Sequence, residues 1–129
     1  MTASDLSVAA DAPRKFLEAI LLEMSRRGLI RSRRGKFGGY VLARDADSIT
    51  FAEVIRVIDG PLALAPCVSR TAFRKCDDCP DLATCSLREA LLRARDATSD
   101  VLDRYSLADA ARAGAPEIPP LQPDQPAAM

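Results

Sequence analysis

The chain has 129 residues, the size of one domain with room for a tail. Aromatic residues make up 5% of it and tryptophan is absent, which excludes a surface built on many stacked rings. The formal net charge is zero, but positions 14–36 hold eight Lys/Arg against two Glu, so this segment carries +6 and the rest −6. A basic segment within a neutral chain is typical of a nucleic-acid contact, although a solvated cationic face has the same charge.

The sequence has no run of about 18 apolar residues, so no membrane-spanning helix is expected. Its first residues, MTASDLSVAADAP, lack the basic and apolar regions of a secretory signal, so we expect a cytoplasmic protein. In that reducing compartment disulfides are rare, and metal or redox roles for cysteine are favoured.

The first predicted elements are two helices joined by a tight turn. Residues 4–10 predict a short helix with Ser4 as its N-cap, and Pro13 is suited to open a second helix that continues to about Arg27. Gly28 supplies its C-terminal stop. Three- and four-residue spacing predicts its buried face at Phe16, Leu17, Ile20, Leu21 and Met24.

The next segment, LIRSRRGKFGGYVLA, predicts two short strands joined by a glycine-rich tip. From Ile30 to Arg34 the side chains alternate with the period of a strand, and the glycines permit the positive φ angles of a hairpin. A cationic hairpin directly after a candidate recognition helix gives the order of a winged helix-turn-helix. The predicted fold class is therefore mainly α with a small β-hairpin.

Two capping boxes predict the helices of the second half. Thr50 and Glu53 form the first, for a helix that ends before Gly60, and Ser86 and Glu89 form the second, for a long helix. Along this long helix, residues at alternating four- and three-residue steps predict a seam for another helix. Its members are Leu87, Leu91, Ala94, Thr98, Val101 and Tyr105. A core-facing stripe has the same spacing, but the rest of the chain is small, so we expect a homodimer.

Four cysteines lie in and just before the stretch RKCDDCPDLATC, and the chain contains no histidine. They are Cys67, Cys76, Cys79 and Cys85. Four thiolates can complete the ligand shell of a [2Fe–2S] or [4Fe–4S] iron–sulfur cluster, which we expect first. A reversible disulfide between Cys76 and Cys79, with no cofactor, is the second interpretation, and one structural Zn²⁺ is the third.

The stretches RRGKFGGYVLAR and ITFAEVIRVIDG resemble the Rrf-two family of bacterial winged-helix transcription regulators. With the cysteine loop and the later YSLAD, the resemblance extends from about Ser4 to Asp109. Two features depart from the family pattern. Family chains open with a further helix before the counterpart of Ser4, and the iron–sulfur members commonly use three cysteines, of which Cys79 and Cys85 keep the spacing of the last two.

The resemblance implies a dimeric regulator of double-stranded operator DNA that is not an enzyme. Lys15 and Glu18 align with base-reading positions of family members, and Arg34 aligns with a wing residue that enters the minor groove. Other basic residues of the wing are expected on phosphates. The expected DNA-contacting set is Arg14, Lys15, Glu18, Arg31, Arg33, Arg34 and Lys36.

These features divide the chain into four predicted parts. They are a winged helix-turn-helix DNA-binding region at 1–60, a cysteine-rich sensor loop at 61–85, a dimerisation helix at 86–112 and a disordered tail at 113–129. We expect the state of the loop to shift the long helix and so the spacing of two recognition helices. Two alternatives are a truncated dimerisation module that does not bind DNA alone, and a small thiol oxidoreductase.

Overall fold

The computed structural model describes residues 1–79 and 81–114. Its elements are α1 (Ala3–Ala10), α2 (Arg14–Arg26), β1 (Ile30–Arg33), β2 (Gly39–Leu42), the 3₁₀ turn η1 (Ala46–Ser48), α3 (Phe51–Ile58), the 3₁₀ turn η2 (Pro66–Val68), α4 (Arg88–Leu102) and α5 (Leu107–Ala113). Helices and one antiparallel hairpin confirm the predicted fold class. The predicted tail lies outside the described residues except for Ala113 and Gly114.

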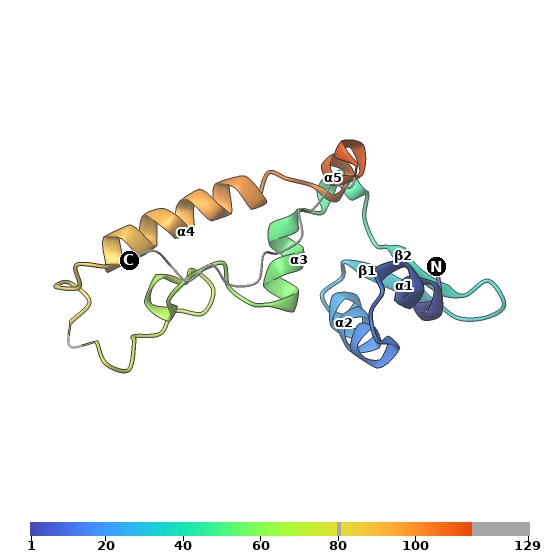
Figure 1. The fold of residues 1–129 in the computed structure, drawn as a ribbon, viewed down its shortest axis with the longest axis horizontal. Coiled ribbons are helices and arrows are strands. Elements are labelled where there is room, and N and C mark those ends of the chain that lie inside the picture. Colours follow the sequence, from blue (N-terminus) through green and yellow to red (C-terminus); the bar gives the residue numbers. More distant parts are fainter. Residues whose placement is uncertain (80, 115–129) are drawn as a thin grey trace, which may run out of the picture.

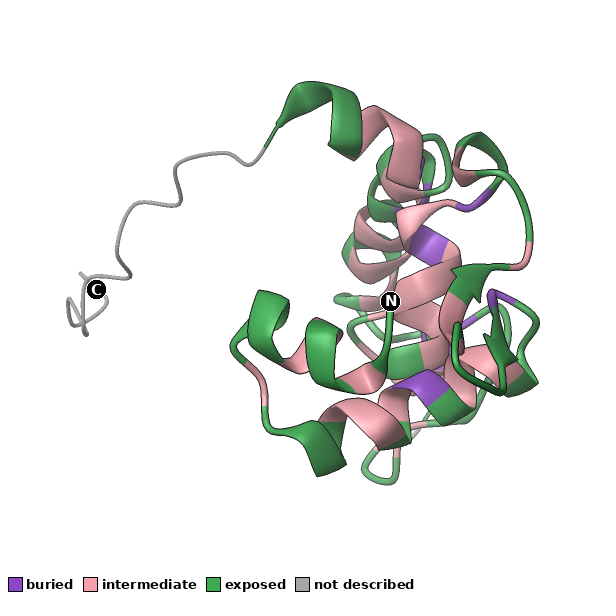
Figure 2. Cartoon of the chain, turned by 90° about the vertical axis from the view of Figure 1, so that its right-hand side faces the viewer, coloured by how far each residue is buried: buried purple, intermediate pink, exposed green. Residues whose placement is uncertain are grey.

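The elements form an elongated molecule (Figure 1). The helices α1 and α2 and the hairpin gather at one end, α3 stands in the middle, and α4 extends toward the other end beside the cysteine loop. Few positions are fully buried, and much of the helical surface is exposed or half-buried (Figure 2). Within the described part of the chain, no helix combines the length and apolar character needed to cross a membrane.

Helix α1 begins one residue before the position that the sequence predicted. Thr2, not Ser4, is its N-cap: the Thr2 hydroxyl accepts a hydrogen bond from the Asp5 amide, and the Asp5 carboxylate accepts one from the Thr2 amide. The prediction of Ser4 was wrong because the extended backbone that a cap requires occurs at Thr2, while Ser4 already lies inside the helix.

The buried face of α2 is shorter than predicted. Leu21 is buried in a core cluster with Leu29, Ile30 and Ile49, and other members of the predicted face, including Leu17 and Met24, pack around this cluster. Phe16, however, is 63% exposed, so its assignment to the buried face was wrong. The core cluster therefore contacts α2 from Leu17 onward, and Phe16 points away from it.

Met1 pairs with β2, the second strand of the hairpin. Ile30 pairs with Leu42, and Arg33 pairs with Gly39. The Tyr40 amide donates to the Met1 carbonyl at 2.7 Å, so Met1 extends the ladder on the side of β2. At Gly39, where φ is 140°, the Met1 carbonyl occupies the place that a Cβ would take.

The long helix predicted from Ser86 is shorter at both ends, and a separate helix, α5, follows it. The N-cap of α4 is Leu87, which makes no side-chain cap hydrogen bond, so the Ser86–Glu89 capping box was a wrong prediction. α4 ends at Leu102, and Ser106 caps α5 through a capping box with Asp109. The predicted dimerisation helix at 86–112 therefore spans both helices.

The break after α4 has a tertiary cause. The Phe51 amide donates to the Tyr105 carbonyl, and the Leu107 amide donates to the Ile49 carbonyl, both at 2.9 Å. These two bonds pair residues on either side of Thr50 and Ser106 like a short piece of antiparallel ladder. The extended backbone at Ser106 that makes this pairing is incompatible with a continuous helix.

We predict that Gly39→Ala destabilises the chain by about 3 kcal/mol or more, because it adds a clash with Met1 to an unfavourable φ. Gly35→Ala is the matched control: φ is 105° there but the space around it is open, so only about 1–2 kcal/mol should be lost. Urea denaturation of the two variants measures both losses. Equal losses would contradict the seating of Met1 on β2.

Candidate nucleic-acid interface and cysteine pocket

The N-terminal turns of α2 present the predicted base-reading residues to solvent. Arg14 and Lys15 are exposed, and Glu18 is half-buried. The Arg14 Nε donates to the Glu18 carboxylate at 2.8 Å, an i,i+4 ion pair on the helix surface. This pair occupies one oxygen of the Glu18 carboxylate, Oε1. Leu22 is also exposed on this helix, and nothing in the structure explains it.

The hairpin carries the predicted wing residues on exposed positions. Arg31 and Arg33 lie on β1, and Arg34 and Lys36 lie in the loop that joins the strands. No carboxylate of the described residues forms an ion pair with any of these four cations. Among the described residues, this hairpin is therefore a surface of uncompensated positive charge. The structure places the wing and α2 at the same end of the molecule (Figure 1).

One wing residue was missed by the sequence analysis. Phe37 is 89% exposed at the tip of the hairpin, and the Lys36 ammonium lies 5.8 Å from its ring centre. An apolar ring surrounded by cations is suited to wedge between base pairs in a minor groove. Its signal in the sequence was an aromatic residue between Lys36 and a Gly-Gly pair, where a turn residue needs no apolar side chain.

All four cysteines line one pocket of about 420 Å³. Cys67 is buried in η2, Cys76 and Cys79 close a turn in which the Cys79 amide donates to the Cys76 carbonyl at 3.1 Å, and Cys85 is exposed before α4. Asp78 and other polar side chains contribute to the same wall. The fold thus brings together residues that are up to 18 positions apart in the sequence.

Backbone hydrogen bonds and two arginines of α4 hold this loop in place. The Arg88 Nη2 donates to the Cys67 carbonyl at 3.4 Å, and the Arg95 Nη1 donates to the Val68 carbonyl at 3.0 Å. The Arg74 amide donates to a carbonyl of η2 at 3.1 Å, which draws the downstream loop back toward Cys67. The pocket therefore depends on the contact between η2 and α4.

The Cys67 thiol lies in an environment that favours its protonated form. Burial raises the pKa of Cys67, and a hydrogen bond to the Cys76 thiol raises it further, while the nearby Arg88 guanidinium acts in the opposite direction. Cys76 is thus the thiol that acts most strongly on Cys67 within their shared pocket. The sequence had instead suggested Cys76 and Cys79 as the reactive pair.

The side chains of this pocket do not form an assembled metal site. Within residues 1–79 and 81–114, no three His, Cys, Asp or Glu side chains are grouped closely enough to hold a metal ion. The side chains of the pocket wall that could serve as thiolate ligands are Cys67, Cys76, Cys79 and Cys85. Arg88 adds a positive charge at the wall, and its buried Nε has no hydrogen-bond partner among the described residues.

The predicted dimer seam lies partly on an open surface of α4. Leu87, Thr98 and Val101 are exposed, while Leu91 and Ala94 are half-buried. Tyr105 lies past the end of α4, where its ring packs on Phe51 at 5.5 Å between centroids. A groove of about 260 Å³ runs between α3 and α4 along this surface, and Ile55, Leu62, Leu64, Ala94 and Thr98 are among its lining residues.

The fold and the exposed basic surface define a winged helix-turn-helix transcription regulator. Residues 1–113 match the model of the Rrf2 family, described as "Iron-dependent Transcriptional regulator". The chain belongs to this family, which confirms the resemblance inferred from the sequence. Regulators of this family bind DNA and act as dimers, and the family and its structural neighbours are transcription regulators, not enzymes.

Two curated relatives illustrate the match in sequence. The chain is 36% identical over 116 residues to a protein of Rhodobacter capsulatus named as an rrf2-like HTH-type transcriptional regulator, an alignment that covers 90% of this chain and 77% of that protein. It is 35% identical over 96 residues to the HTH-type transcriptional regulator CymR of Bacillus subtilis, covering 74% of this chain and 61% of CymR.

Solved structures show the same fold. CymR (YrzC), the global cysteine regulator of B. subtilis, superposes with a TM-score of 0.69 at 30% identity, over 89% of this chain and 80% of CymR. The oxidized form of Staphylococcus aureus CymR has a TM-score of 0.62 at 26% identity, over 84% and 74%. T. potens IscR, at 23% identity and a TM-score of 0.65 over 88% and 69%, is similar in fold.

Proposed function

We propose that this chain is a dimeric transcription regulator whose affinity for operator DNA is set by an iron–sulfur cluster in the four-cysteine pocket. The sensing part rests on one observation. Cys67 and three cysteines that lie 9 to 18 positions downstream all line the same pocket. The DNA-binding part is supported by the family and by the cationic surface of α2 and the wing.

In the proposed complex, α2 enters the major groove and the wing follows the flanking backbone. Lys15 is an unhindered donor for guanine, and Glu18 is an acceptor for cytosine. Arg31 and Arg33 bind phosphates, which supplies affinity without sequence information. Arg34 and Phe37, at the wing tip, meet the minor groove.

The proposed cluster is held by Cys67, Cys76, Cys79 and Cys85. When bound, it supplies a redox-active and chemically labile group that reports on iron or oxidant levels. The protein's own part is to provide four thiolates on one pocket and a compensating cation. Arg88 supplies that cation at the wall and at the same time fixes the Cys67 carbonyl.

The proposed signal passes from the pocket into α4. Cys85 lies three residues before Arg88, at which α4 begins, so a ligand on Cys85 fixes the start of that helix. We propose that two copies of the chain meet along the exposed α4 surface that includes Val101. A change in the position of α4 then alters the distance between two recognition helices, which must match half-sites about one helical turn apart.

A second candidate is a metal-free thiol switch, which the contact between Cys67 and Cys76 favours. In this reaction the two thiols form one S–S bond and give up two electrons and two protons to a peroxide, which is reduced to two water molecules. Closure of this bond would pull the Cys76 turn against η2 and thus change the loop that precedes α4.

We predict that Lys15→Ala costs about 1–3 kcal/mol of specific binding and leaves nonspecific binding nearly unchanged, because it removes a base contact. Arg33→Ala is the matched control and should weaken binding to all sequences and reduce the salt slope by about 1. Fluorescence anisotropy over a salt series measures both, with an operator that the wild-type chain selects from random duplexes. Identical profiles for the two variants would contradict the groove assignment.

For the cluster, we predict that operator affinity of anaerobically isolated protein changes when iron is removed by chelation, and that Cys79→Ser abolishes this change. Thr84→Ala, which alters the same pocket wall without removing a thiol, should retain it. Circular dichroism establishes that both variants are folded. A response in Cys79→Ser equal to that of wild type would refute the assignment.

For the thiol switch, we predict that metal-free protein treated with hydrogen peroxide forms a disulfide between Cys67 and Cys76. Peptide mapping by mass spectrometry under non-reducing conditions identifies the pair. A disulfide that joins Cys76 to Cys79 would favour the pairing that the sequence alone suggested and would count against this contact.

A further inference from the structure

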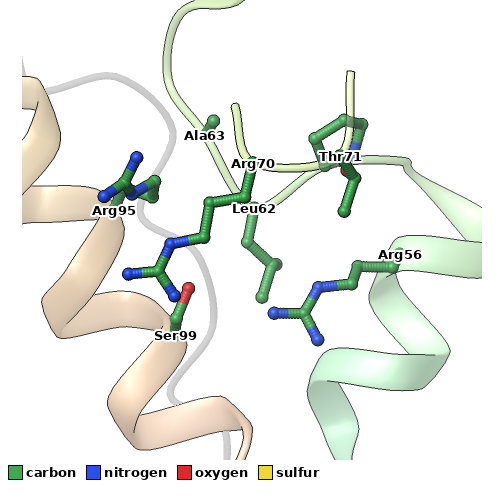
Figure 3. A pocket seen from close by; sticks show the side chains of 8 residues that line it. Arg56, Leu62, Ala63, Arg70, Thr71, Arg95 and Ser99 are labelled. Carbon is green, nitrogen blue, oxygen red and sulfur yellow. The ribbon is translucent and has the colours of Figure 1, made fainter. Parts of the chain in front are cut away.

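A smaller pocket, of about 100 Å³, lies between α3, the loop at 61–71 and α4 (Figure 3). Arg56 of α3, Arg70 of the loop and Arg95 of α4 line it, together with Ser99. In Figure 3 the guanidinium groups of Arg56 and Arg70 extend into the space between the two helices, and Ser99 is on the α4 side of this space. Three cations from three separate segments thus surround one small space.

Two carboxylates compensate part of this charge. Arg56 donates to Asp103 through Nη1 at 2.7 Å and Nη2 at 3.1 Å. Arg70 and Arg95 share Oδ1 of Asp96, at 2.6 and 2.8 Å. Hydrogen bonds from these arginines lower the pKa of both aspartates, so both stay ionised at neutral pH. The group of three arginines and two aspartates keeps a net charge of +1.

Arg70 keeps donors that this network does not use. A guanidinium has five N–H donors, and among the described residues Arg70 commits one of them, from Nη2 to Asp96. Arg56 commits two to Asp103. The residue Ser99, which is 5% exposed, contributes its hydroxyl to the same wall. Donors of this kind suit the oxygens of an oxyanion.

The size of the pocket limits what it can hold. A volume of about 100 Å³ corresponds to about three water molecules at ~30 Å³ each, which is room for a tetrahedral oxyanion. DNA phosphates are not the occupant, because the pocket lies between α3 and α4, away from α2 and the wing (Figure 1).

We propose that this arginine pocket, defined by Arg56, Arg70, Arg95 and Ser99, binds a small dianionic oxyanion of the size of phosphate or sulfate. The excess positive charge attracts it, and guanidinium groups that approach from three segments match oxygens that do not lie in one plane. A planar carboxylate would engage fewer of these donors.

The position of the pocket makes its occupant a candidate effector. Arg95 also donates to the Val68 carbonyl, one residue from Cys67, and Arg70 lies two residues after the end of η2. An oxyanion there ties α3 and α4 to the segment that carries the first cysteine. This effector role rests on the proposed DNA-binding function, but occupancy of the pocket does not, so the two are tested separately.

The full chain is titrated without DNA with sodium sulfate, and separately with inorganic phosphate, at an ionic strength held constant with sodium chloride. Amide chemical shifts and the thermal midpoint are recorded. We expect saturable shifts at Thr71 and Ser99 and a raised midpoint with both anions. Arg70→Gln should raise the Kd for both anions about tenfold or more, because a charge-assisted contact is lost.

Arg93→Gln is the matched control, since Arg93 is an exposed arginine of α4 that pairs with Glu89 outside the pocket. It should bind both anions like wild type. Shifts that do not saturate, shifts that chloride alone reproduces, or equal weakening in the two variants would overturn the proposal. If Arg70→Gln failed to fold, the location of the wild-type shifts, at Thr71 and Ser99 or elsewhere, would still decide.

Discussion

The attachment of η2 to α4 is the contact on which the functional arrangement depends. The carbonyls of Cys67 and Val68 accept hydrogen bonds from Arg88 and Arg95, and both residues of η2 are buried. Buried carbonyls without partners would cost about 1–3 kcal/mol each. Because the two arginines are about two helical turns apart on α4, they fix both the place and the direction of η2. The position of the first cysteine follows from this geometry.

The same helix joins the two ends of the molecule through α3. At the beginning of α3, the Phe51 amide donates a hydrogen bond to the Tyr105 carbonyl. Near the end of α3, Arg56 forms an ion pair with Asp103 through two hydrogen bonds. Helix α2 packs against α3, with Val54 and Val57 of α3 against the core cluster that includes Leu21 of α2. These contacts form a continuous chain of packed elements from α4 through α3 to α2. In the proposed function, this is the route by which the cysteine pocket governs operator affinity.

Local chemistry predicted most of the elements, and tertiary contacts decided the rest. The capping box at Thr50 is present as predicted, whereas the equally good pattern at Ser86 is not used, because α4 begins after Leu87. The pattern at Ser106 does cap a helix, since pairing with α3 ends the preceding one. Spacing indicated four thiols in one region, but the neighbour of Cys67 could not be predicted, because η2 is placed by distant arginines.

The most direct test of the account is the metal content of the full chain isolated without oxygen. Its visible absorption spectrum is recorded, and iron, acid-labile sulfide and zinc are measured on the same sample. A cluster held by the four thiols gives a broad visible band with iron and sulfide in matching amounts, both lost when the four cysteines are replaced by serine. A colourless protein with one zinc per chain, or one without metal, would contradict the claim that the four thiols hold a cluster.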